Sequence, residues 1–115
     1  MNKWVVKFYK SSRGDEYVNN FIRDQDKITR SKIIKTIDLV CRYGPNLGLP
    51  HSRNMRNGLY ELRVMGKNNI RIFYIFKLGT IIYFLHGFKK KSQSTPRKEI
   101  NIARKRQKEL TQYNI

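Results

Sequence analysis

The residues of this chain that can do chemistry gather in its second half. Arg63 and Arg71 fall in two stretches rich in β-branched and aromatic residues, and His86 falls in a third. A guanidinium group offers forked donors that match the oxygens of a phosphate. A histidine can take up or release a proton near neutral pH. The set is suited to binding a phosphodiester and to acid–base chemistry on it.

Each of these residues also has a structural interpretation. Arg63 can form an ion pair with Glu61, which lies two positions before it. Glu61 can instead serve as the general base, or it can orient Arg63. A histidine on a strand is often a hydrogen-bonded structural residue, whereas a guanidinium beside it favours the neutral form that suits a base. The sequence leaves these alternatives open.

Three predicted β-strands position these side chains. Residues 60–65 alternate in character, and residues 70–76 and 81–88 are nearly continuous in β-branched and aromatic residues, which is typical of strands. The joints between them, Gly66-Lys67-Asn68-Asn69 and Leu78-Gly79, are turn-forming.

The lengths of the two turns decide which side chains share a face, since a shift of one residue moves every side chain to the other face. A two-residue loop at Leu78-Gly79 places Arg71 directly opposite His86. An odd-length loop around Lys67 places Arg63 beside Arg71. These registers predict a polar face with Glu61, Arg63, Arg71 and His86. They also predict an apolar core face with Tyr60, Leu62, Val64, Ile72, Tyr74, Phe76, Ile81, Tyr83 and Leu85.

The charge of the chain indicates its partners. Twenty-five Lys and Arg against eight Asp and Glu give a net charge of +17, whereas a surface of mixed sign is the norm. Such an excess indicates a polyanion or an acidic protein partner. We expect RNA, DNA, or both RNA and an acidic neutralising protein. The candidate RNA-binding residues are Lys89, Arg53, Arg56, Arg97, Lys98 and Arg104.

A nuclease needs metals or a substitute for them. Two-metal cleavage requires clustered carboxylates, and the sheet segment offers Glu61 alone. Two histidines and one cysteine are a poor zinc set, so we expect no metal and no cofactor. The remaining route is attack of a ribose 2′-OH on the adjacent phosphate, which leaves a 2′,3′-cyclic phosphate and a 5′-OH. It requires a proton acceptor, a proton donor and cations, and it works on RNA but not on DNA.

Length and composition predict a single domain over residues 1–115. One cysteine, Cys41, excludes an internal disulfide, and its place on a helical stripe predicts a small buried hydrophobic residue. No apolar run approaches the roughly 20 residues of a membrane helix, and the first residues lack the hydrophobic region of a signal peptide. We therefore expect a cytoplasmic protein without a membrane partner.

The remaining segments read as a scaffold. Residues 4–9 predict a strand, and helices are expected to open at Asp15 and near Asp26. The second helix carries an apolar stripe and stops at Tyr43-Gly44-Pro45. Residues 46–57 are expected to form a loop. The last helix runs from Pro96 to about Gln112, with Thr95 as its N-cap. The stripe of the second helix consists of Ile33, Ile34, Ile37, Val40 and Cys41.

Three segments together resemble a known family. They are Gly58-Leu59-Tyr60-Glu61-Leu62-Arg63, Arg71-Ile72-Phe73-Tyr74, and residues 85–96, Leu-His-Gly-Phe-Lys-Lys-Lys-Ser-Gln-Ser-Thr-Pro. They are similar to the HigB-type toxins, also called phage Gp49-like, of the RelE/ParE superfamily of bacterial type II toxin–antitoxin modules. The resemblance implies an α+β fold, with a small antiparallel-rich sheet of about four strands, two N-terminal helices and one C-terminal helix.

The resemblance also implies an activity and partners. HigB-type toxins cleave messenger RNA, usually on the translating ribosome, and a helix-turn-helix antitoxin neutralises them. Arg63, Arg71, Lys90 and Lys91 occupy positions like those the family uses for RNA binding and catalysis, and His86 is the candidate base. Lys89 extends the lysines to three, which leaves open which of them matters. ParE relatives instead poison DNA gyrase by binding, and a degenerate toxin that merely binds its partners is a third possibility.

Overall fold

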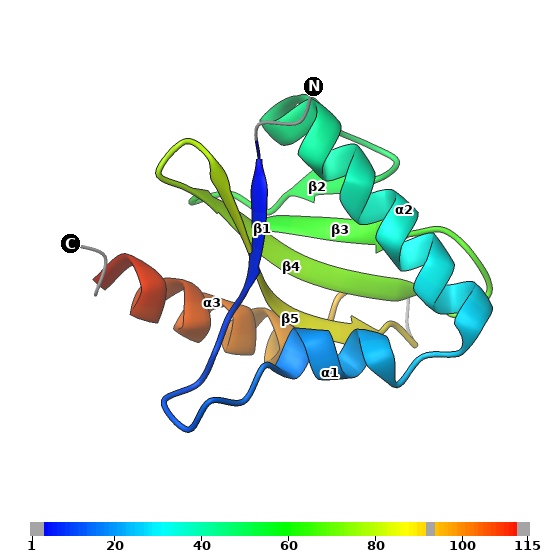
Figure 1. Cartoon of the computed structure of the whole chain (residues 1–115), viewed down its shortest axis with the longest axis horizontal. Coiled ribbons are helices and arrows are strands. Elements are labelled where there is room, and N and C mark those ends of the chain that lie inside the picture. Colours follow the sequence, from blue (N-terminus) through cyan, green and yellow to red (C-terminus); the bar gives the residue numbers. More distant parts are fainter. Residues whose placement is uncertain (1–3, 92–93, 113–115) are drawn as a thin grey trace.

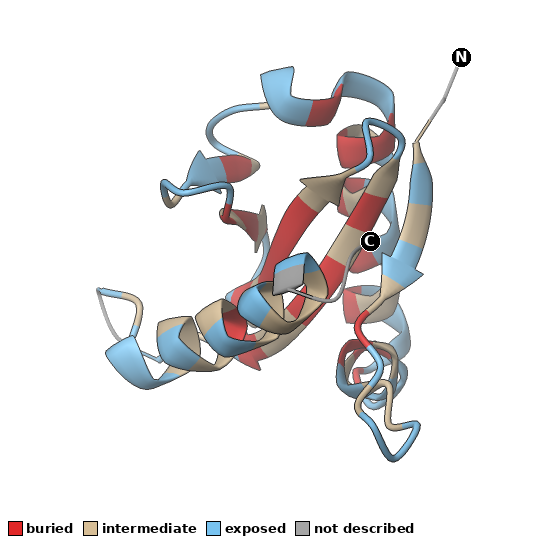
Figure 2. Cartoon of the chain, turned by 90° about the vertical axis from the view of Figure 1, so that its left-hand side faces the viewer, coloured by how far each residue is buried: buried red, intermediate tan, exposed pale blue. Residues whose placement is uncertain are grey.

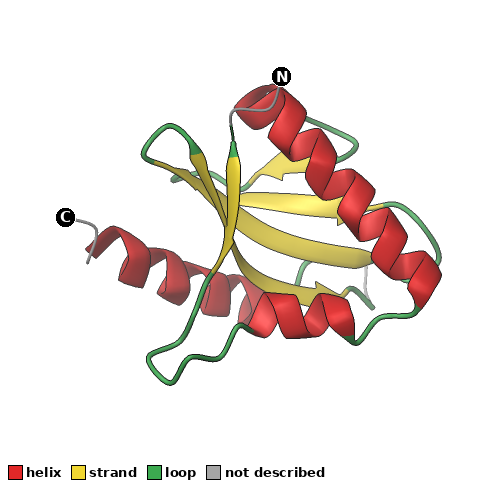
Figure 3. Cartoon of the chain, in the orientation of Figure 1, coloured by secondary structure: helices red, strands yellow, loops and turns green. Residues whose placement is uncertain are grey.

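The computed structural model describes residues 4–91 and 94–112, and Ser92 and Gln93 of the lysine-rich motif lie outside the described residues. The described residues form an α+β fold of strands and helices (Figure 3). A 3₁₀ turn, Gly44–Asn46, follows the second helix. The elements are β1 (Val5–Phe8), α1 (Tyr17–Arg23), α2 (Lys27–Tyr43), β2 (Ser52–Asn54), β3 (Tyr60–Val64), β4 (Ile70–Lys77), β5 (Ile81–Lys89) and α3 (Arg97–Gln112).

The strands form a mixed five-stranded sheet in the order β1-β5-β4-β3-β2. β1 runs parallel to β5, and all the other neighbours are antiparallel. The expectation of about four strands was wrong because β2 lies in the segment predicted to be a loop. Ser52-Arg53-Asn54 has no β-branched or aromatic residue, so this short edge strand is produced by its pairing with β3 and not by local propensity.

Helices cover both faces of the sheet, with α1 and α2 on one face and α3 on the other (Figure 1, Figure 2). The core under α1 and α2 contains Val18, Ile22, Ile33, Val40, Leu62, Val64, Ile70, Ile72, Tyr74, Ile82 and Phe84. A second core under α3 contains Tyr9, Leu59, Phe73, Ile75, Leu85, Phe88 and Ala103. The face of the sheet that was predicted to be polar carries polar side chains at one end only. The second core, under α3, covers the rest of that face.

The register of β4 and β5 differs from the prediction. The turn has three residues, so Lys77 pairs with Ile81, and the core face of β5 carries Ile82 and Phe84 instead of Ile81, Tyr83 and Leu85. A bulge then follows, because Tyr74 pairs with Phe84 while Phe73 pairs with His86. Arg71 consequently lies opposite Phe88, and the prediction that it lies opposite His86 was wrong.

The bulge also decides on which face His86 lies. The three-residue turn shifts the register by one residue, which alone would move His86 to the face opposite Arg71, and the bulge adds a second shift that reverses this. His86 thereby shares the α3 face with Arg71 despite the two-residue shift in register. Gly87 points the other way, and a Cβ there would lie 2.7 Å from Phe21 Cδ2. Only glycine at this position lets α1 pack so closely on β5.

The predicted helix boundaries are largely confirmed. Asp26 caps α2 by accepting a hydrogen bond from the Thr29 N–H at 2.7 Å, and the helix ends at Tyr43, directly before Gly44. Cys41 is buried as predicted, and burial raises the pKa of its thiol. Ile34 is 60% exposed and does not belong to the buried stripe of α2.

α3 is held to the sheet by polar contacts as well as by its core. Arg106 donates to the Leu85 carbonyl at 2.8 Å, and its guanidinium lies 4.5 Å from the ring centre of Tyr17. Tyr9 donates to Glu109 at 2.6 Å, and burial together with this carboxylate raises the pKa of Tyr9 to about 12. In the described part of the chain, no helix is long and apolar enough to cross a membrane.

Candidate functional site

Neighbouring strands bring the predicted cations together on the α3 face. Arg63 on β3 pairs with Arg71 on β4, as predicted from an odd-length turn. One position further along the face, Arg53 on β2 pairs with Glu61 on β3. We call Arg53, Arg63, Arg71 and Lys90 the cationic cluster. Its residues come from β2, β3, β4 and the segment after β5, so only the folded sheet assembles it.

Glu61 is the carboxylate at the centre of the cationic cluster, and its side chain is fully buried. One oxygen, Oε1, lies 3.4 Å from Arg63 Nε, and the other, Oε2, accepts a hydrogen bond from Thr95 Oγ1 at 2.7 Å. A buried charge needs such partners. Glu61 therefore fixes Arg63 and ties the segment before α3 to the sheet, which is the orienting alternative of the sequence analysis.

Arg71 is half-buried and incompletely paired. Its Nη1 donates to the Ile70 carbonyl at 3.2 Å, but its buried Nε finds no acceptor within the described structure. Burial lowers the pKa of Arg71, and Glu61 opposes this effect while the positive charge of Arg63 adds to it. Such a group is poised to donate to an incoming oxyanion.

Among the three lysines, Lys90 belongs to the cationic cluster. Its backbone N–H donates to the Asn69 carbonyl at 2.9 Å, which holds it beside the β3–β4 turn. Burial lowers the pKa of Lys90, and the charge of Arg71 lowers it further. Lys89 and Lys91 are exposed. Lys90 thus lies close enough to Arg71 for their charges to interact.

His86 lies in the contact between β5 and α3. Its Nε2 is 2.6 Å from Glu99 Oε1, and its Nδ1 is 3.5 Å from Nη1 of Arg106. Nε2–H donating to Glu99 and Nδ1 accepting from Arg106 describe a neutral ring. Burial lowers the pKa of His86 in agreement with this, although Glu99 acts in the opposite direction. Both ring nitrogens are engaged, so the contacts of His86 position α3.

This environment predicts that His86 makes stability depend on pH. The unfolded histidine titrates near pH ~6.5, whereas the folded one has a lower pKa. The unfolded state therefore binds more protons below that pH, so the stabilisation is complete above pH ~6.5 and is lost as the pH falls. We expect the free energy of unfolding to decrease between pH 7.5 and 5.5 more in the wild type than in His86→Gln. Denaturant titrations at the two pH values measure this, and an equal decrease in both proteins would contradict it.

The remaining predicted RNA-binding residues have different surroundings. Arg104 donates to the carbonyls of Arg56 and Met55, at 3.1 and 3.0 Å, and so docks α3 on the β2–β3 loop. Arg56 is otherwise exposed, as are Arg97 and Lys98 in the first turn of α3. These three side chains are free to meet a polyanion, whereas Arg104 has a structural use.

Two residues that were not predicted to belong to the site, Thr95 and Asn69, also contribute to it. Thr95 was expected to cap α3, but its hydroxyl donates a hydrogen bond to Glu61. The first hydrogen bond of the helix is accepted by the carbonyl of the next residue, Pro96. The contact of Thr95 with Glu61 and that of Asn69 with Lys90 each join segments far apart in the sequence, and no local pattern indicates them. Within residues 4–91 and 94–112, no three side chains among His, Cys, Asp and Glu come together to hold a metal ion.

Comparison with known proteins identifies the family. The family model described as phage derived protein Gp49-like (DUF891) matches residues 20–108, which include α2, all strands except β1, and most of α3. The comparison with curated proteins gave no match. Because the family match covers most of the chain and every member of the cationic cluster, the protein belongs to the Gp49-like family of phage-derived proteins (DUF891).

Proposed function

We propose that this protein is the toxin of a type II toxin–antitoxin system and acts as a metal-independent endoribonuclease on messenger RNA. The cationic cluster is the observation that carries this proposal. It sets four cations around one buried carboxylate. The charge of Arg63 lowers the pKa of Arg71, and the charge of Arg71 lowers the pKa of Lys90. Membership in the Gp49-like family, which suggests a phage-derived toxin-like protein, and the resemblance to HigB-type toxins support it.

The charge imbalance of the cluster suits the transition state of RNA cleavage. When the 2′-OH attacks, negative charge accumulates on the phosphorane oxygens. Arg71, whose Nε–H has no acceptor among the described residues, and Arg63, held by Glu61, would donate to these oxygens. Because the cations repel one another before the phosphate binds, an oxyanion relieves repulsion as well as forming hydrogen bonds.

Cleavage needs two proton transfers. The 2′-OH gives its proton to a solvent water molecule, and the departing 5′-oxygen gains one. Lys90 is the proposed donor to the departing 5′-oxygen, since burial and the charge of Arg71 lower its pKa and ease release of the proton. His86 would first have to lose its contact with Arg106 before its Nδ1 could accept the 2′-OH proton. We therefore assign His86 to positioning α3, which follows the motif that contains Lys90.

The proposed partners are the translating ribosome, which presents the mRNA, and a helix-turn-helix antitoxin. The net charge of +17 suits both the RNA and an acidic neutralising protein. A small helix-turn-helix gene directly beside this one would support the toxin assignment. Co-expression of its product should suppress growth arrest.

Cleavage products test the mechanism directly. Purified protein added to a translating extract should cut mRNA, leaving 5′-OH and 2′,3′-cyclic phosphate ends. A transcript with a single 2′-deoxy nucleotide at the cut position should resist cleavage there, because the nucleophile is missing. Ends with a 5′-phosphate would reject this chemistry even if cutting occurs. Growth arrest with intact transcripts, together with inhibition of purified gyrase in a supercoiling assay, would favour the ParE-type alternative.

The lysines give a graded prediction for RNA binding. Lys90→Ala should weaken binding to a short single-stranded RNA and reduce the slope of log K against log salt by about 0.7, the loss of one neutralised phosphate. Lys89→Ala and Lys91→Ala should have smaller effects, because these lysines are exposed. Fluorescence anisotropy across a salt series measures the slopes, with Lys35→Ala on α2 as the control of equal charge. An unchanged slope for Lys90→Ala would remove it from the site.

A further inference from the structure

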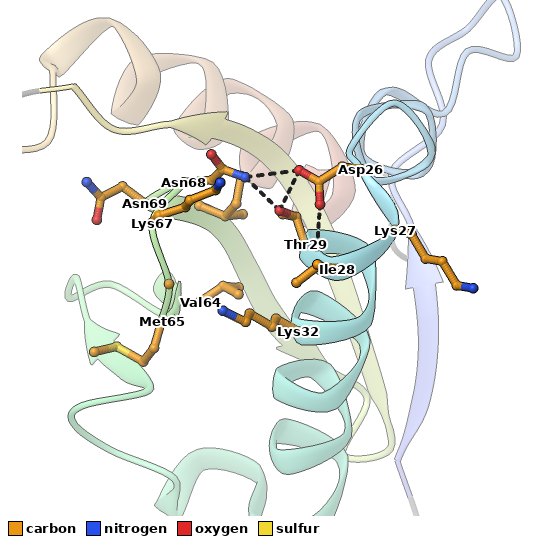
Figure 4. A pocket seen from close by; sticks show the side chains of 12 residues that line it. Asp26, Lys27, Ile28, Thr29, Lys32, Val64, Met65, Lys67, Asn68 and Asn69 are labelled. Atoms are coloured by element: carbon orange, nitrogen blue, oxygen red, sulfur yellow. Dashed lines mark hydrogen bonds between the residues drawn. The ribbon is translucent and has the colours of Figure 1, made fainter.

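A concave surface lies on the face of the sheet opposite to the cationic cluster. It is a groove of about 540 Å³ between the start of α2 and the β3–β4 turn (Figure 4). Its lining includes Val64 and Ile70, whose side chains belong to the core under α1 and α2. Arg63 and Arg71 are the sequence neighbours of these residues and point to the opposite face. A ligand in the groove therefore leaves the cationic cluster open.

The groove exposes large apolar side chains on both of its walls. Ile28 in the first turn of α2 is 70% exposed, and Met65 at the end of β3 is 59% exposed. Single exposed apolar residues are ordinary, but two that line one cavity mark a binding surface. None of the lining residues is aromatic, so the groove offers no platform on which a nucleobase could stack.

The charge at the groove is positive. Lys32 reaches across to the turn, since a Cβ at Gly66 would lie 3.0 Å from Lys32 Nζ, and Lys67 lies in the turn itself. Asp26 is the one acidic residue in the lining. It accepts hydrogen bonds from the Thr29 hydroxyl at 3.0 Å and from Asn68 at 3.3 Å, as Figure 4 shows. Its carboxylate is thus used to join α2 to the turn, and it balances only part of the charge of the lysines, mainly that of Lys67.

We propose that this groove binds an acidic segment of a partner protein, which inserts an apolar side chain beside Ile28 and Met65 and places carboxylates near Lys32 and Lys67. The apolar lining supplies the contact area, and the lysines select for negative charge. Binding of this segment does not involve RNA cleavage, so a binding measurement tests the groove without an activity assay. The turn also contacts one member of the cationic cluster, since the Lys90 N–H donates to the Asn69 carbonyl at 2.9 Å.

The chain offers matched variants for the test. Ile28→Ser removes the apolar side chain of the groove, and Ile34→Ser removes an equally large one that is 60% exposed elsewhere on α2. Lys32→Glu reverses a charge in the groove, and Lys35→Glu makes the same charge change outside it. All four positions are exposed, so the variants should melt with the wild type. A displayed library of random 16-residue peptides is selected on each full-length protein.

We expect a class of peptides that is enriched on the wild type, Ile34→Ser and Lys35→Glu. Its members should carry net negative charge and a large apolar residue. Their affinity should fall about tenfold or more on Ile28→Ser and Lys32→Glu, because buried aliphatic contact and charge pairing are lost. Binding of a short RNA to the wild type should not compete with these peptides.

Several results would overturn the proposal. One is the absence of any peptide class that distinguishes the groove variants from their controls. A class of neutral or basic peptides would be another. RNA affinity that falls on Lys32→Glu but not on Lys35→Glu would make the groove a nucleic-acid surface. Self-association of the wild type that Ile28→Ser abolishes would make it an interface between copies of this chain.

Discussion

Arg71→Ala should abolish RNA cleavage and growth arrest while leaving the protein folded. Loss of one preorganised donor to a transition-state oxyanion typically costs about 10²–10³ in rate. The fold should tolerate the change, because Arg71 Nε makes no hydrogen bond to a described group and the guanidinium has a single one, to the Ile70 carbonyl. Removing this charge relieves its repulsion of Arg63 and Lys90 but also removes its attraction to Glu61. Because these effects oppose one another, the melting temperature should change little.

The experiment pairs single-turnover cleavage of a defined mRNA with a thermal melt of each variant. Arg42→Ala is the matched control, since it removes one arginine from an exposed ion pair with Asp38 on α2. It should cut RNA at the wild-type rate. Undiminished cleavage by a folded Arg71→Ala protein would remove the central catalytic assignment. A folded variant that neither cuts nor binds RNA would assign Arg71 to RNA binding instead of the chemical step.

Leu62→Ala should lose activity for the opposite reason, through instability. Leu62 is completely buried at the centre of β3, within the core under α1 and α2. Truncating a buried leucine costs roughly 2–5 kcal/mol through lost transfer free energy and the cavity left behind. Small domains are stable by only about 5–15 kcal/mol, so this loss removes a large part of the free energy of unfolding. The neighbours of Leu62 on β3, Glu61 and Arg63, would lose their alignment with it.

Denaturant unfolding of Leu62→Ala and of Ile34→Ala separates burial from the chemistry of the substitution. Ile34 is 60% exposed on α2, so its truncation should change the free energy of unfolding by less than about 0.5 kcal/mol. At temperatures where Leu62→Ala remains folded, its cleavage rate should return toward that of the wild type. A loss below 1 kcal/mol for Leu62→Ala would contradict the packing described for this core.

Local patterns in the sequence were enough for β1, β3, β4 and β5, for the helices, and for the pairing of Arg63 with Arg71. The β-branched runs of β4 and β5 can form little else, and Asp26 and Gly44 mark both ends of α2. An odd-length turn was chosen because it left one face apolar, and β3 and β4 do pair in that way. The charge of +17 is likewise a property of composition and needs no fold.

Only the tertiary structure decided how the site is assembled. Strand β2 exists because β3 offers it a partner, and that pairing brings Arg53 to Glu61. Because of the three-residue turn and the bulge, Phe88 lies opposite Arg71, and His86 contacts Glu99 on α3. Neither feature has a local signature, since a bulge is favoured by what packs on both faces of the sheet. The link from Thr95 to Glu61 and the position of Lys90 near Arg71 have the same origin, because contacts between distant segments follow from packing and not from sequence pattern.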